Sequence, residues 1–233
     1  MGFQQCIQEK AIYRMVPNGE FIIIVIYVDV IFVAGTVLEL LNVFKKRMAS
    51  LFEISDLGDL TYYLGIEVSQ EKDYVEIKQE RYAMKILKEA VMEDCNATLY
   101  PKEKDIKLSK TEVEPGVEAT EYQKVMGCLR YILHTRPDLT YLVGVVSRYM
   151  QSLRESHARY SDSSHNVDID DGRSTTRNVV YLGTSPITWC SQKQTTAALC
   201  SCEAEFMAAI AAAYQTIWLR ELLAKVLGWI DKR

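Results

Sequence analysis

The stretch Phe21–Gly35 reads FIIIVIYVDVIFVAG, with a single aspartate, Asp29, inside an otherwise apolar run. The run is rich in Ile and Val, and these branched side chains favour strands over a helix. Because a charge is costly to bury without a partner, we expect Asp29 at a tight turn, where its carboxylate reaches water or a metal. The sequence therefore predicts a hairpin of two core strands with Asp29 at the connection.

Composition narrows the class of protein. A chain of 233 residues, 48% hydrophobic and 25% charged, is typical of one large or two small globular domains. The net charge of -4 and the pI of about 5.5 argue against a broad nucleic-acid-binding surface, although they are compatible with a local basic patch. Six cysteines without a C-x-x-C pair indicate reduced thiols. The start MGFQQCIQEK lacks the pattern of a signal peptide, and the run 21–33 is too short for a membrane span. We expect a soluble intracellular protein, cytoplasmic or nuclear.

Turn and capping signals place further elements along the chain. A T-x-x-E capping box at Thr36 predicts a helix to about residue 49, and a T-x-x-Q box at Thr120 predicts another to about residue 134. Pro137 fits the first turn of a partner helix that ends near residue 150, so these two helices form an αα-hairpin. Between them we expect strands near 61–69 and 74–78, a helix over 80–91 and a long polar loop over 96–119.

The last third of the sequence changes character. Residues 151–176 are polar, and two strands follow at Asn178–Leu182 and Ile187–Trp189. A long helix then runs to Gly228, the position at which glycine commonly ends a helix. Its apolar residues predict a buried stripe made of Phe206, Ile210, Ala213, Ile217 and Leu222.

Three carboxylates on separate elements invite a chemical interpretation. They are Asp29, Asp162 in YSDSSH, and Glu205 in the first turns of the last helix. Carboxylates aimed inward from separate elements are how oxygen-ligand sites for Mg²⁺ are built, and paired metals clamp the oxygens of a phosphodiester. Each also has a purely structural interpretation: Asp29 as turn chemistry, Asp162 as a solvated charge, and Glu205 as a favourable partner of the helix dipole.

Two other charged groups are weaker candidates. The run Lys45, Lys46 and Arg47 fits a solvated helix face better than a nucleic-acid-binding patch, since the chain is acidic overall. The cluster Asp168, Asp170 and Asp171 lacks the glycine and the distal glutamate of an EF-hand loop, which argues against calcium.

Several long motifs resemble the reverse transcriptase and ribonuclease H part of a copia-type LTR-retrotransposon polyprotein. IIIVIYVDVIFVAGT resembles the palm hairpin of that family, which normally carries Y-V-D-D, and LFEISDLGDLTYYLGIEV is similar to the segment that follows it. EYQKVMGCLRYILHTRPDLTYLVGVVSRYM resembles its G-x-L-x-Y…TRPD…SRFM stretch, and the region from SDSSHNVDIDDG to CEAEFMAAI resembles its ribonuclease H region. These motifs follow one another in the family's order over nearly the whole chain.

The resemblance implies an α+β fold, with a truncated polymerase palm and connection region followed by a partial ribonuclease H-like α/β domain. It implies a partial palm over 1–95, a linker loop and αα-hairpin over 96–156, and a partial ribonuclease H-like domain over 157–233. It also gives Asp29 the role of a polymerase Mg²⁺ ligand, and Asp162 and Glu205 those of ribonuclease H carboxylates. In the parent family the cofactor is Mg²⁺ and the partner is a primer-template or an RNA/DNA hybrid.

The departures from the family pattern are concentrated at these positions. Val30 stands where the second turn aspartate is expected, and Ser164 where the second aspartate of S-D-x-D is expected. The earlier palm strand and the strand after the last helix have no counterpart in this sequence, and the join near 155–160 is shorter than in the family. A two-metal site needs several carboxylates, so we expect an inactive remnant with poor Mg²⁺ occupancy, weak nucleic-acid binding and no membrane partner. The alternatives are a non-catalytic binding protein and an open reading frame with no selected function.

Overall fold

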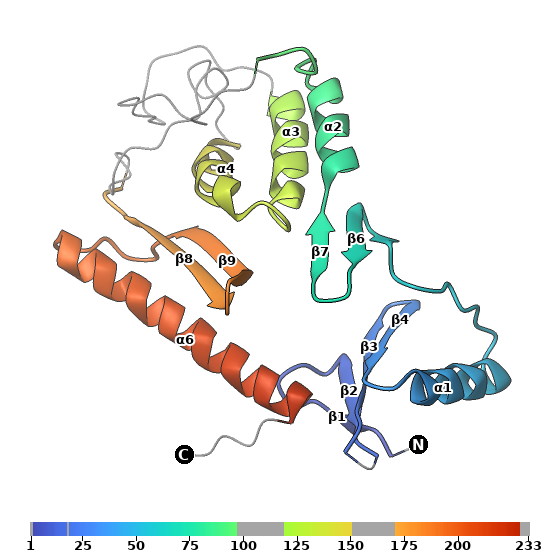
Figure 1. The fold of residues 1–233 in the computed structure, drawn as a ribbon. Helices are drawn as coiled ribbons and strands as arrows, with labels where there is room; N and C mark the ends of the chain where they lie inside the picture. The colour runs from blue at the N-terminus through green and yellow to red at the C-terminus, as the bar shows by residue number, and fades with distance from the viewer. Residues whose placement is uncertain (1, 18, 97–118, 151–170, 229–233) are drawn as a thin grey trace. The chain divides into compact units, whose positions relative to one another are not determined.

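The computed structural model describes residues 2–17, 19–96, 119–150 and 171–228 (Figure 1). Helices and strands are mixed along the chain, which confirms the coarse prediction of an α and β protein. The chain divides into two compact units, residues 1–59 with 213–233, and residues 60–212. In the described part of the chain, no helix has both the length and the apolar character that crossing a membrane requires.

The first unit is an antiparallel sheet with one helix packed on it. The strand order is β1-β2-β3-β4. The elements are β1 (Gln4–Gln5), β2 (Ile12–Met15), β3 (Ile22–Tyr27), β4 (Val30–Gly35) and the helix α1 (Leu38–Leu51). Ile22 and Ile24 project from one face of β3 and meet Phe44 of α1, and these three buried side chains form the centre of the core. The alternation of a strand puts every second residue on that face.

The predicted hairpin is confirmed as β3 and β4. The strands pair from Ile22↔Gly35 to Tyr27↔Val30, so Val28 and Asp29 form the two-residue connection. The expectation that the flanks of Asp29 are buried is wrong near the turn, where the side chain of Ile26 is 43% exposed and that of Tyr27 is 55% exposed. The hairpin therefore projects beyond the core that holds its other end.

The helix that follows the hairpin begins without the predicted capping box. Val37 is the N-cap of α1 and makes no side-chain cap. The Thr36 hydroxyl instead accepts from the backbone N–H of Phe21 at 3.1 Å and donates to the Glu20 carboxylate. The T-x-x-E pattern failed here because Glu20 and Phe21, in the segment just before β3, compete for the same hydroxyl.

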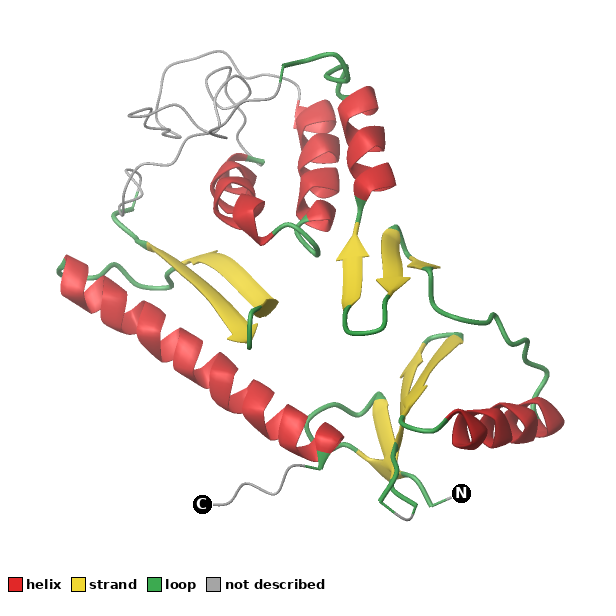
Figure 2. Cartoon of the chain, in the orientation of Figure 1, coloured by secondary structure: helices red, strands yellow, loops and turns green. Residues whose placement is uncertain are grey.

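The second unit contains two small sheets and several helices (Figure 2). Its first part is an antiparallel sheet of three strands and a helix: β5 (Tyr62–Tyr63), β6 (Ile66–Gln70), β7 (Val75–Lys78) and α2 (Glu80–Glu89). The strand predicted near 61–69 is interrupted at Leu64 and Gly65, both of which have positive φ. The Tyr131 hydroxyl donates to the carbonyl of Leu64 and ties this break to the next helix.

The αα-hairpin is confirmed as α3 and α4 with short 3₁₀ turns around the second helix. These elements are α3 (Ala119–Ile132), η1 (Pro137–Leu139), α4 (Thr140–Val146) and η2 (Ser147–Tyr149). Pro137 occupies the first turn, as predicted. The capping box predicted at Thr120 is wrong, because Thr120 already lies inside α3.

A two-stranded hairpin follows, β8 (Thr175–Leu182) with β9 (Ser185–Lys193), and both strands are longer than predicted. One face of the hairpin meets α4, where a Cβ added at Gly144 lies 3.2 Å from the Ser191 hydroxyl. The opposite face carries the buried Thr176, whose hydroxyl accepts from the side-chain amide of Gln194 at 3.2 Å. The same amide donates to the carbonyl of Ala204 at 2.8 Å, so Gln194 fastens the hairpin to the next helix.

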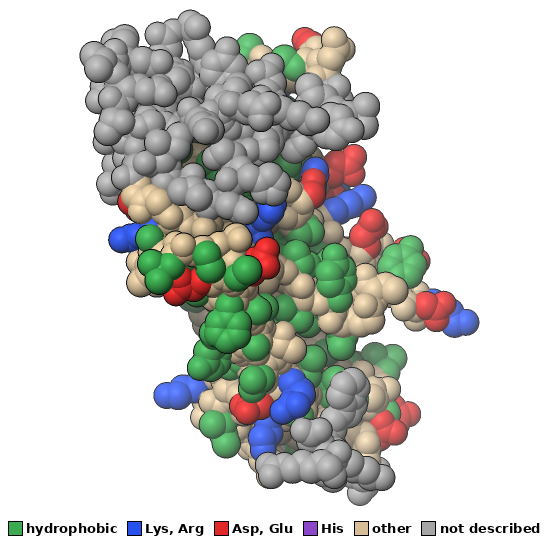
Figure 3. All heavy atoms as spheres, turned by 90° about the vertical axis from the view of Figure 1, so that its left-hand side faces the viewer, with side chains coloured by type: hydrophobic (Ala, Val, Ile, Leu, Met, Phe, Trp, Pro, Cys, Tyr) green, Lys and Arg blue, Asp and Glu red, His purple; other side chains and the backbone are tan. Residues whose placement is uncertain are grey.

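The last helix, α6 (Ser201–Leu227), departs most from its prediction. The buried stripe is wrong, since Phe206 is 67% exposed, Ile217 is 49% exposed and no residue of the helix is buried. On the face drawn in Figure 3, apolar side chains lie open on the surface instead of being enclosed. Gly228 follows the helix with φ of +72°, as expected for its end. There the Arg14 guanidinium donates to the carbonyls of Lys225 and Leu227, both at 3.3 Å.

We predict that Ile22→Ala lowers the free energy of unfolding by about 2–5 kcal/mol, since it leaves a cavity beside Phe44. Chemical denaturation of the full chain measures this change. Ile26→Ala, on the same strand but 43% exposed, is the matched control and is expected to cost less than half as much. Equal losses for the two variants would contradict the assignment of the core.

We also predict that the stability difference between the wild type and Tyr122→Phe shrinks as pH rises above 10. Burial raises the pKa of Tyr122 from 10.0 to about 12, and its hydroxyl donates to the Val146 carbonyl at 2.9 Å. A raised phenol pKa favours the protonated form in the folded state, so its stabilisation is complete below pH 10 and is lost towards pH 12. Denaturation at pH 9 to 12 measures this, with the exposed Tyr74→Phe as control; parallel curves for wild type and Tyr122→Phe would refute it.

Candidate functional site

The tip of the β3–β4 hairpin presents Asp29 to solvent. Asp29 is exposed, and the preceding Val28 is 87% exposed. Val28 has φ of +53°, a left-handed conformation that is unfavourable for a branched side chain. The turn therefore holds a strained valine beside the carboxylate, an arrangement that is often found where the backbone must aim a functional group.

The hairpin tip does not fit a magnesium site by its donor set. Mg²⁺ takes oxygen ligands and is usually held by at least one or two carboxylates. Asp29 supplies one carboxylate, while Val30, paired across the turn with Tyr27, has an aliphatic side chain without a donor. Among the described residues, no three His, Cys, Asp or Glu side chains are grouped closely enough to hold a metal ion.

The basic run Lys45–Arg47 lies on α1, and its three side chains have different surroundings. Lys45 forms an ion pair with Asp56 at 3.0 Å, whereas Lys46 and Arg47 are exposed. The backbone N–H of Gly58 and the Lys45 ammonium hold the pKa of Asp56 below its ordinary value. One of the three cations is thus engaged within the protein, and nucleic-acid binding by this run stays a prediction.

The other two predicted carboxylates belong to the last part of the chain. Asp162 lies outside the described residues, as do Asp168 and Asp170 of the acidic cluster. Glu205 is exposed on α6, in the second unit, so its predicted place beside a buried stripe is wrong. The structure therefore describes one member of this pair and leaves its partnership with Asp162 as a prediction.

A capping interaction that the sequence analysis missed begins α6 close to Glu205. The Glu203 backbone N–H donates to the Cys200 sulfur at 3.4 Å, and the Glu203 carboxylate accepts from the Leu199 N–H at 2.5 Å. This is similar to a capping box with cysteine in place of serine, except that the carboxylate binds the N–H of Leu199, the residue before the N-cap. The spacing C-x-x-E of Cys200 and Glu203 was the feature of the sequence that could have predicted this helix start. Glu203 is accordingly a structural residue at the helix start.

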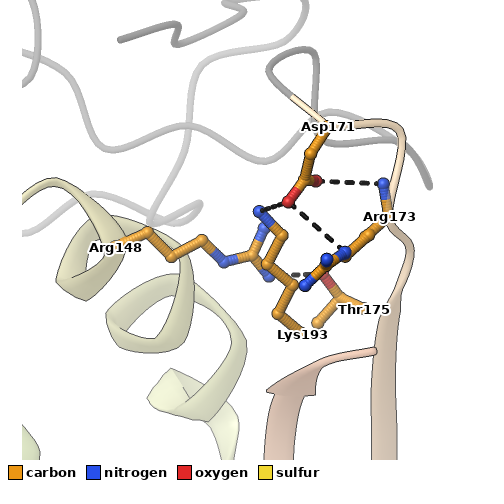
Figure 4. Close-up of polar contacts among 5 residues, drawn as sticks. All are labelled: Arg148, Asp171, Arg173, Thr175 and Lys193. Atoms are coloured by element: carbon orange, nitrogen blue, oxygen red, sulfur yellow. Dashed lines mark hydrogen bonds and ion pairs between the residues drawn. The ribbon is translucent and has the colours of Figure 1, made fainter. Parts of the chain in front are cut away.

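A polar cluster beside α4 was also missed. It is formed by Arg148, Asp171, Arg173, Thr175 and Lys193 (Figure 4). Asp171 contacts the Lys193 ammonium at 2.8 Å and the Arg173 Nε at 3.5 Å. Burial would raise the pKa of Asp171, but the hydrogen bonds from Lys193 and from the Arg173 N–H outweigh it and lower the pKa. Asp171 is therefore held by cations of its own chain.

Comparison with known proteins connects these features to one family. The family model described as "Reverse transcriptase (RNA-dependent DNA polymerase)" matches residues 1–104, which include the whole β3–β4 hairpin. No solved structure matches the chain.

Three curated relatives extend the similarity beyond the reverse transcriptase match. The Retrovirus-related Pol polyprotein from transposon RE2 of Arabidopsis thaliana is 27% identical over 97% of this chain, and the chain spans 18% of that polyprotein. The Pol polyprotein from transposon TNT 1-94 of Nicotiana tabacum is 26% identical over 92% of this chain and 19% of its own length. The uncharacterized mitochondrial protein AtMg00810 of Arabidopsis thaliana is 29% identical over 84% of this chain and 93% of its own length. The chain thus spans less than a fifth of the length of these polyproteins.

We predict that Val28→Gly raises the free energy of unfolding by about 0.5–1 kcal/mol. Removing the left-handed strain gains about 1–2 kcal/mol, and the greater freedom of glycine in the unfolded chain offsets part of it. The control Val30→Gly, two residues away on β4, relieves no such strain and is expected to destabilise. Asp29→Asn is expected to change the free energy by less than about 0.5 kcal/mol, because Asp29 is exposed. Chemical denaturation measures all three; a loss of stability in Val28→Gly would contradict the strain.

Proposed function

We propose that the chain is a catalytically inactive remnant of a copia-type retrotransposon Pol polyprotein, to which it is similar over most of its length and in which residues 1–104 match the reverse transcriptase family. One observation carries the proposal: the β3–β4 hairpin is intact, but Val30 follows Asp29 at its tip. The scaffold that presents the carboxylate is kept, while its neighbouring donor is missing.

The cost of that substitution follows from electrostatics. The parent family performs RNA-directed DNA synthesis with Mg²⁺, for which Asp29 is the proposed remaining ligand at this turn. Removing one preorganised electrostatic group typically lowers the rate by about 10²–10³. A valine side chain also brings apolar bulk to the place where a hydrated cation needs oxygen. Weak binding of Mg²⁺ and loss of polymerase activity are the expected outcome.

For the last third of the chain, we propose a partial ribonuclease H-like domain over 157–233, after a partial palm over 1–95 and a connection over 96–156. The order of a β8–β9 hairpin followed by a long helix supports it. Asp162 and Glu205 are the proposed remnants of its carboxylates, and Ser164 replaces a further aspartate. We propose that cleavage of RNA/DNA hybrids is also lost.

A second candidate function is binding to nucleic acid or to other proteins without chemistry. The exposed apolar side chains of α6 are compatible with protein contacts, and the exposed Lys46 and Arg47 with contacts to phosphate. An open reading frame without a selected function is the remaining interpretation. The six cysteines are free thiols, which supports an intracellular location, cytoplasmic or nuclear.

Activity of the full chain is predicted to be absent in primer extension on an RNA template and in RNA/DNA-hybrid cleavage, with Mg²⁺ or Mn²⁺. Asp29→Asn and Asp162→Asn are the background controls, and the wild type should not exceed them. Turnover that disappears in either variant would overturn the proposal.

Restoring the missing donor is predicted to improve metal binding. Val30→Asp places a second carboxylate next to Asp29 and is expected to tighten Mn²⁺ binding at least about tenfold, as two carboxylates share the cation. Titration calorimetry measures the affinity, with Val30→Asn as the uncharged control of the same shape. An equal gain in both variants, or a gain that survives Asp29→Asn, would show that the hairpin tip is not the remnant of the metal site.

A further inference from the structure

The strand β7 is the outer strand of the three-stranded sheet β5-β6-β7 (Figure 1). On one side it pairs with β6, where Val68 lies opposite Ile77 and Gln70 lies opposite Val75. On its other side, no strand in the described part of the chain is paired with it. An outer strand with a free side presents unpaired backbone N–H and C=O groups to other chains.

The hydrogen bonds of β6 show which backbone groups of β7 point to that free side. The Val68 N–H donates to the carbonyl of Thr61 at 2.8 Å, on the side of β5, so Val68 directs its backbone groups away from β7. In an antiparallel ladder, hydrogen-bonded and non-hydrogen-bonded pairs alternate. Ile77, opposite Val68, therefore points its N–H and C=O away from β6, and so does Val75 two residues before it. Among the described residues, these four groups have no hydrogen-bond partner.

The side chains of β7 are exposed on both faces of the sheet. Val75 is 62% exposed and Ile77 is 51% exposed on one face, and Glu76 and Lys78 are exposed on the other. Lys78 forms an ion pair with Glu80 at 3.4 Å, but an ammonium group has three donors and can bind a second carboxylate. Charges on an edge strand usually keep other strands away. Here the two charges have opposite signs, so a strand of the same sequence that runs in the opposite direction is not repelled.

We propose that β7 is a self-association surface, on which a second copy of this chain pairs its own β7 antiparallel about Ile77. In that register Ile77 faces Ile77 of the second copy, and Glu76 faces Lys78 of the second copy. Because the N–H and C=O of Ile77 point outward, the two isoleucines form a hydrogen-bonded pair with two reciprocal backbone bonds. Glu76 and Lys78 then form a non-hydrogen-bonded pair, the kind in which side chains approach most closely. The two-fold axis repeats this pair, so two ion pairs join the copies.

The charges of β7 select this register over its neighbours. Registers centred on Glu76 or on Lys78 also let outward backbone groups meet, but each sets two like charges directly opposite one another. A register centred on Val75 sets Lys78 opposite Lys72. Like charges directly opposite each other on two strands are destabilising, whereas opposite charges stabilise the pair. The register about Ile77 is therefore the one that the charge pattern favours.

The association is expected to be weak and to depend on concentration. Val68 and Ile77 of the two copies form one apolar row across both sheets, but a strand of four residues provides only a small contact. Its area is below the roughly 1,200 Å² at which standard interfaces begin, so we expect a dissociation constant of about 10–100 μM. The inference is independent of the proposed loss of catalysis, because β7 carries none of the carboxylates assigned to it.

Sedimentation equilibrium of the full chain tests the proposal, under reducing conditions that keep the free cysteines from linking chains. Glu76→Lys and Lys78→Glu each set like charges opposite one another and are expected to raise the dissociation constant of the dimer at least about tenfold. The double variant Glu76→Lys/Lys78→Glu restores opposite charges and is expected to return it to within about threefold of the wild type. Lys46→Glu makes the same change of charge on the exposed face of α1 and is expected to leave it unchanged.

A backbone variant tests the hydrogen bonds separately from the charges. Ile77→Pro removes the outward N–H but no donor to β6, a position at which edge strands tolerate proline, and is expected to abolish the dimer. Thermal melts check that the variants are folded, and the charge variants decide the question if Ile77→Pro is not.

Three results would overturn the assignment to β7. They are a wild-type chain that stays monomeric up to about 0.5 mM, a dimer that Glu76→Lys leaves intact, and a double variant that associates no more tightly than the single ones. A dimer that Phe206→Glu dissociates, while the β7 variants do not, would place the association on the exposed face of α6 instead.

Discussion

The burial of Ile22 and Ile24 against Phe44 is the constraint on which the first unit depends. Both isoleucines lie on one face of β3, so the same contact orients the strand, selects which side chains face the helix and sets the register with β4. A slip of one residue would turn both isoleucines away from α1. The position of Asp29 at the tip is a consequence of that register, since the pairing ends at Tyr27↔Val30. Packing in the core thus sets the geometry of the hairpin tip.

The hairpin was predictable because its signal is local and strong. A run of branched side chains broken by a single charge admits few alternatives to two strands and a turn. The capping boxes at Thr36 and Thr120 were predicted wrongly, for two different reasons. The Thr36 hydroxyl forms hydrogen bonds with residues just before β3 instead of capping α1. The helix α3 begins before Thr120, so Thr120 is not its first capping position. The stripe of α6 failed for a related reason. The spacing of apolar residues shows which face of a helix could be buried. The exposed Phe206 shows that this spacing does not tell whether another element packs against that face.

The candidate sites divide in the same way. Asp29 was visible from sequence as a charge without a local partner, and the structure places it at an exposed turn. The polar cluster beside α4 was not visible from sequence, because its members come from η2, from the segment before β8, from β8 and from β9. The pairing of Thr175 with Lys193 helps to bring them together. Sequence order separates Arg148 from Lys193 by more than forty positions. Charge clusters assembled across strands need the register, which a single sequence does not contain.

The contact between Arg14 and the end of α6 bears on how the chain acquires its structure during synthesis. The guanidinium belongs to the second strand, while the carbonyls it reaches lie 211 and 213 residues later. A ribosome releases the sheet long before it releases that helix end, so Arg14 can form these two hydrogen bonds only after the end of α6 has been made. The first unit therefore contains contacts of very high sequence separation despite its simple meander, and such contacts slow folding.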